Sequence, residues 1–88
     1  MKDKQEFVLS VIREVAEEDF NNEIEWIDTY VDRIKYRNEK ENKFDNLSHE
    51  AIDDIIHELI FQEKLIREQN DFWIDDKIRP NTKVEGEL

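Results

Sequence analysis

Apolar residues in the first part of the chain recur at the spacing of one helix face. The recurring positions are Phe7, Val8, Val11, Ile12, Val15 and Ala16, with Phe20 following. This spacing has the period of an amphipathic α-helix and lacks the strict alternation of a half-buried strand. We therefore predict a helix over residues 3–19. Asn21 and Asn22 end it, because asparagine favours caps and turns over helix interiors.

A second apolar stripe runs through residues 23–38. Its members are Ile24, Ile27, Tyr30, Val31 and Ile34. Acidic side chains gather at the start of this segment and basic ones at its end, an order that complements the helix macrodipole. The pattern predicts a second helix over these residues. A charged, asparagine-rich loop from Glu39 to Leu47 is expected to follow it.

Ser48 marks the start of a third helix. Its hydroxyl group is a good N-cap, and Leu47 before it is placed to pack against Ile52 as a hydrophobic staple. The stripe that follows contains Ile52, Ile55, Ile56, Leu59, Ile60 and Ile66, and Phe61 and Leu65 broaden it. The helical period of this stripe predicts that the segment is helical as far as residue 66 or beyond.

The C-terminal part of the chain leaves two interpretations open. Either the third helix continues through Asn70 and Asp71, or these residues break it and a short fourth helix spans residues 71–78. Pro80 is expected to close the folded part, and residues 81–88 to form a disordered tail. The predicted fold is an all-α bundle of three helices, with or without this short fourth helix, forming a single domain over residues 1–80.

The charge of the chain restricts its partners. It has 24 acidic and 13 basic residues and a net charge of −11, which repels DNA, RNA and anionic lipid and favours a basic protein partner. No apolar run is long enough to cross a membrane, and residues 1–6 lack the apolar core of a signal peptide. We therefore expect a cytoplasmic protein that binds neither nucleic acid nor membranes directly.

Catalytic and metal-binding patterns are weak. His49, Asp53 and His57 recur every four residues on one helix face, but that face lies opposite the isoleucine stripe and is typical of a solvated surface. Glu14 and Glu17, together with Glu50 and Asp53, have the carboxylate spacings of a magnesium-dependent all-α nucleotide pyrophosphohydrolase, which stays open as an alternative. The favoured interpretation is a protein that is not an enzyme and has no metal or cofactor.

Rows of carboxylates indicate the leading functional hypothesis. Acidic side chains three and four residues apart on a helix present regularly spaced negative charge, as a nucleic-acid backbone does. The candidate rows are Glu14, Glu17, Glu18 and Asp19; Glu25, Asp28 and Asp32; and Glu50, Asp53, Asp54 and Glu58. We expect an inhibitor, of the kind that phages use against host defence or transcription, that blocks a basic nucleic-acid-binding enzyme by charge mimicry.

Aromatic residues suggest a further contact with a partner. Phe72 and Trp73 are adjacent, so both cannot face the same helical core, and the exposed one is expected to belong to an interface. The main alternative to mimicry is a homodimeric helical adaptor that associates through such aromatic residues. In that alternative the acidic surface serves only solubility.

Overall fold

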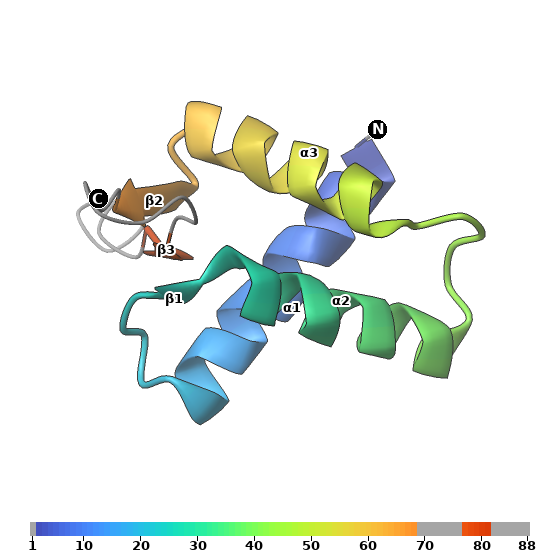
Figure 1. Ribbon diagram of the computed structural model, residues 1–88, viewed down its shortest axis with the longest axis horizontal. Helices are drawn as coiled ribbons and strands as arrows, with labels where there is room; N and C mark the ends of the chain where they lie inside the picture. The colour runs from blue at the N-terminus through green and yellow to red at the C-terminus, as the bar shows by residue number, and fades with distance from the viewer. Residues whose placement is uncertain (1, 69–76, 82–88) are drawn as a thin grey trace.

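The computed structural model describes residues 2–68 and 77–81 of the chain. In this part, three helices combine with a small antiparallel sheet (Figure 1). The helices are α1 (Lys2–Asp19), α2 (Ile27–Glu41) and α3 (His49–Phe61). The strands are β1 (Glu25–Trp26), β2 (Leu65–Glu68) and β3 (Lys77–Pro80). The protein is therefore mostly helical, but it is not the pure all-α bundle that the sequence predicted.

The ends of the helices follow from local chemistry. The sequence prediction for α1 is confirmed to within one residue at its start, and Asn21 and Asn22 adopt left-handed backbone conformations directly after it. The predicted cap of α3 is also confirmed, because the Ser48 hydroxyl accepts a hydrogen bond from the amide of Ala51 at 3.1 Å. Asn42 ends α2 in the left-handed conformation, which asparagine tolerates better than most residues.

The core lies where the three helices meet. The inner stripes of all three helices are buried there, with Ile12, Ile34, Ile52 and Ile56 among the side chains that expose no surface. Leu65 from β2 and Ile78 from β3 complete the core at the end of the molecule where the sheet lies (Figure 1). The sheet therefore covers core surface that three short helices leave open.

The second helix starts later than the sequence predicted. Residues 23 and 24 lie outside regular structure, and Glu25 and Trp26 form β1 before α2 begins at Ile27. Trp26 occupies the N-cap position of α2 with an extended backbone and provides no side-chain cap. The helical period had included Ile24, but pairing with β3 keeps this part of the chain extended.

The two C-terminal strands replace predicted helix. Leu65 and Ile66 belong to β2 and not to α3, which ends at Phe61. The strand β3 lies in the middle of the sheet, where Ile78 is opposite Glu25 of β1 and Arg67 of β2. Its side chains alternate between half-buried and buried, which is the two-residue period of a strand.

Two C-terminal predictions fall largely outside the described residues. Residues 71–76 of the predicted fourth helix lie outside them, as do Phe72 and Trp73, whereas its last two residues, 77 and 78, belong to β3. Of the predicted tail, only Asn81 is described. Its backbone amide donates to the carbonyl oxygen of Lys64 and its side chain to that of Glu63. Within the described residues, no helix has the length and apolar character needed to span a membrane.

Candidate functional site

Helix α3 has one apolar face and one acidic face. Ile52, Ile56 and Leu59 are buried against the other helices. The opposite side of the helix is exposed along its whole length, because residues four, seven and eleven positions apart share one side of an α-helix. Its side chains are Glu50, Asp54, His57, Glu58 and Phe61, and the half-buried Asp53 lies at its margin. We call these six residues the α3 face.

The carboxylates of the α3 face keep their charge available to a partner. No lysine or arginine occurs between His49 and Phe61. In residues 2–68 and 77–81, the carboxylates of Glu50, Asp53, Asp54 and Glu58 form no ion pair with a lysine or arginine side chain. Glu58 accepts one hydrogen bond, from the side-chain amide of Gln62 at 3.3 Å.

Each of the two histidines of α3 lies close to one carboxylate. The Nδ1 atom of His57 lies 2.8 Å from the backbone oxygen of Asp53, so this nitrogen donates its proton there, and it lies 3.5 Å from the Asp53 carboxylate. At the start of the helix, His49 Nε2 lies 3.6 Å from the carboxylate of Asp28 in the first turn of α2. Both histidines are about half exposed, and each contacts a different carboxylate.

The residues considered for metal binding do not converge in the described part of the chain. There, no group of three or more histidine, aspartate or glutamate side chains lies close enough to hold a metal ion. An open pocket of about 530 Å³ lies between the first half of α1 and the loop after α2, lined by Asp3, Glu6, Phe7, Ser10, Lys43 and Phe44. The Ser10 hydroxyl in this pocket donates a hydrogen bond to the backbone oxygen of Phe7, three residues earlier in the same helix.

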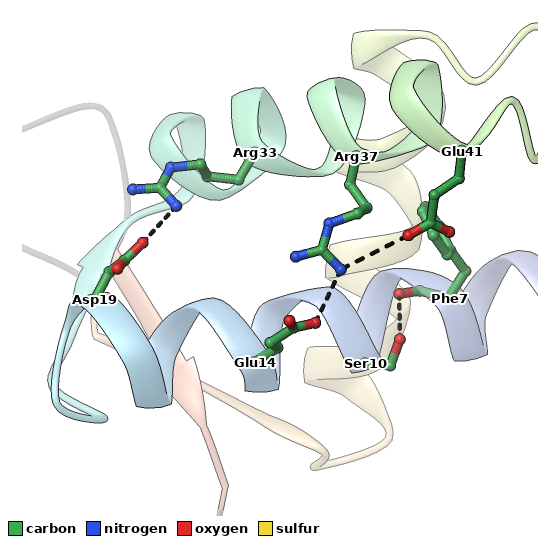
Figure 2. Close-up of polar contacts among 7 residues, drawn as sticks. All are labelled: Phe7, Ser10, Glu14, Asp19, Arg33, Arg37 and Glu41. Carbon is green, nitrogen blue, oxygen red and sulfur yellow. Dashed lines mark hydrogen bonds and ion pairs between the residues drawn. The ribbon is translucent and has the colours of Figure 1, made fainter.

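The acidic row of α1 is partly neutralised by arginines of α2. Figure 2 shows Arg37 reaching Glu14 and Arg33 reaching Asp19 across the contact between the two helices. The Arg37 guanidinium donates to Glu14 at 2.9 Å, and this hydrogen bond and charge lower the pKa of that carboxyl below its usual value. Glu14 and Asp19 therefore join α1 to α2, while Glu17 and Glu18 are exposed.

The predicted row of the second helix does not form a row in the structure. Glu25 lies in β1, where its carboxylate accepts a hydrogen bond from the amide of Trp26 at 3.0 Å. Asp28 points toward His49 of α3, and Asp32 is exposed further along α2. Of the three predicted rows, the α3 row is the one that lies on a single helix and forms no ion pair with a lysine or arginine among the described residues.

Phe61 is the residue of this surface that the sequence prediction misplaced. The apolar pattern assigned it to the core, but 83% of its surface is exposed. It lies four residues after His57 and three after Glu58, so its position belongs to the acidic side of the helix. A helical projection places Phe61 opposite Ile52 and Ile56, but the apolar residues around Leu59 and Ile60 obscured this signal in the sequence.

Comparisons with known proteins identify no relative: no family model, curated protein or solved structure matches the chain. The acidic side chains of the α3 face repel the phosphates of DNA.

Proposed function

We propose that this protein is an acidic protein-binding inhibitor whose α3 face occupies a basic, nucleic-acid-handling surface of another protein. The observation that carries the proposal is the composition of that face. Four carboxylates lie along it, and the helix contains no lysine or arginine. Negative charge at this spacing competes for the same basic groove that binds a phosphate backbone.

The distribution of charge among the helices supports this assignment. On α1, Glu14 and Asp19 are held by arginines of α2, so they are already engaged within the fold. On α3 the corresponding charges face solvent and are free to attract a partner over the range of a Debye length, about 8–10 Å at ordinary salt. Such attraction raises association rates and makes binding sensitive to salt.

The test is binding by a charge-neutralised α3 face. The full chain is immobilised, exposed to nuclease-treated bacterial lysate and washed over a salt series. The variant carries Glu50→Gln, Asp53→Asn, Asp54→Asn and Glu58→Gln. We expect the wild-type chain to retain a basic protein that salt releases steeply, and the variant to lose it, since several exposed carboxylates act together while each alone contributes only about 0–1 kcal/mol.

The matched control removes the same charge elsewhere. Asp3→Asn, Glu6→Gln, Glu39→Gln and Asp45→Asn neutralise four exposed carboxylates outside α3, so this control variant has the same net charge as the α3 variant. Its partner binding is expected to stay close to wild type. Nucleic acid is expected to displace the captured protein. Equal loss in both variants, or a ternary complex of this protein, its partner and nucleic acid, would refute the proposed function, and self-association alone would favour the homodimeric adaptor.

A further inference from the structure

The α3 face combines charge with one exposed aromatic ring. Phe61 is 83% exposed at the last residue of the helix, in line with Glu50, Asp54 and His57 on the same side. Phe61 lies one helical turn after His57 and Glu58. The surface is therefore a row of carboxylates that ends in an aromatic group.

The α3 face does not fit against the same face of a second copy. A two-fold contact of this kind would bring two acidic surfaces together, and like charges repel. The partner must instead supply positive charge along the length of α3. It must also supply an apolar recess at one end, because an aromatic side chain contributes to binding when it fills a pocket that excludes water.

We propose that Phe61 is the anchor of the α3 face and enters an apolar pocket at the end of a basic groove on the partner protein. This inference rests on the proposed function and adds the chemistry of the partner surface to it. The helix lies in the groove and contacts it through one side of the helix, as amphipathic helices bind grooves in other complexes. The side chains on that side are Glu50, Asp54, His57 and Phe61. The carboxylates set the rate of encounter and its salt dependence, while Phe61 slows dissociation.

The two contributions are separable because they respond differently to salt. The partner obtained with the wild-type chain is purified, and its affinity for wild type, Phe61→Ala and the α3 charge variant is measured from about 0.05 to 0.5 M salt. We expect Phe61→Ala to weaken binding about 10- to 30-fold at every salt concentration, with an unchanged slope against salt. The charge variant is expected to reduce the slope itself.

Tyr36 supplies the matched control for an exposed aromatic side chain. It is 63% exposed on α2, outside the α3 face, and Tyr36→Ala is expected to leave the affinity unchanged. If Phe61→Ala binds like wild type while the charge variant loses binding, the anchor is wrong and the proposed function stands. If Phe61→Ala and Tyr36→Ala weaken binding equally, the anchor is also wrong. If the charge variant binds like wild type, both proposals fail. Circular dichroism of each variant confirms that the helices are intact.

Discussion

Tyr30 has a buried hydroxyl group without a hydrogen-bond partner among the described residues. The side chain exposes no surface and packs edge-on against Phe20, with ring centroids 5.6 Å apart and an interplanar angle of 85°. Burying a hydroxyl group without a hydrogen bond costs about 1–3 kcal/mol of folding free energy. The ring of Tyr30 therefore stabilises the core while its hydroxyl group opposes folding.

We predict that Tyr30→Phe stabilises the protein. The substitution keeps the ring and its contact with Phe20 and removes only the unpaired oxygen. Against the gain stands the small void that the oxygen leaves, so the expected increase in the free energy of unfolding is about 1 kcal/mol. For a domain of this size, that increase raises the melting temperature by about 4–8 °C.

Urea denaturation followed by circular dichroism measures this change. Tyr36→Phe is the control, because the Tyr36 hydroxyl group is on an exposed side chain and its removal is expected to change stability by less than about 0.5 kcal/mol. A loss of 1 kcal/mol or more in Tyr30→Phe would show that the Tyr30 hydroxyl group is hydrogen-bonded in the folded protein, and the reasoning would be refuted.

The same hydroxyl group makes stability depend on pH. Burial, with a smaller contribution from the charge of Glu25, raises the pKa of Tyr30 to about 12, while the pKa of tyrosine in an unfolded chain is about 10. The unfolded chain therefore loses this proton first as pH rises, and stability is expected to fall between pH 10 and 12. Comparing Tyr36→Phe with the double variant Tyr30→Phe/Tyr36→Phe isolates this loss, which should be absent from the double variant.

Two further predictions concern the ends of the loop between α2 and α3. Asn38 is buried and closes the loop through two hydrogen bonds with the backbone of Phe44, at 2.9 and 3.0 Å, so Asn38→Ala should lower the free energy of unfolding by about 2–4 kcal/mol; a loss below about 0.5 kcal/mol would show that other contacts hold the loop. Ser48→Ala should cost about 1 kcal/mol and Ser48→Asp should restore most of it, measured by thermal denaturation, whereas Ser10→Ala serves as a control that removes no cap.

The helices were predictable because their signals are local. The first helix was predicted from residue 3 and begins at residue 2, and Ser48 caps α3 as its sequence context indicated. Each of these signals depends on residues within one or two helical turns. Where the chain follows such short-range preferences, the sequence was enough to place the element.

The strands were not predictable in the same way. Their stability comes from pairing between distant segments, as when Glu25 lies opposite Ile78 in the sheet. The alternation in β3 covers only Lys77 to Pro80, which is too short to compete with the helical period of the preceding apolar run. Leu65 is buried as the sequence predicted, but it is buried from a strand and not from a helix.

The candidate site was predictable in its charges and not in its aromatic residue. The α3 row follows from the spacing of carboxylates along one helix, whereas the pairing of Glu14 with Arg37 depends on how α1 packs against α2 (Figure 2). The exposure of Phe61 depends on where α3 ends and β2 begins, and that boundary is set by the pairing of β2 with β3.

The stability of the α3 charge variant distinguishes a functional surface from a structural one. Glu50, Asp53, Asp54 and Glu58 contain three like-charge pairs at spacings of three or four residues, each destabilising a helix by about 0.2–0.5 kcal/mol. Neutralising all four relieves this repulsion and loses the favourable contact of Glu50 with the helix N-terminus, so we expect the variant to be between 0 and about 1 kcal/mol more stable than wild type.

High salt should narrow that difference, because it screens the repulsion in the wild-type protein. By contrast, Glu14→Gln should not stabilise the protein, because it removes a partner of Arg37. If urea denaturation instead shows the α3 variant to be less stable by 1 kcal/mol or more, these carboxylates support the fold, and their exposure ceases to be an argument for a partner. A variant that is more stable than wild type would show that these charges oppose folding, which is the result expected of a surface that serves binding.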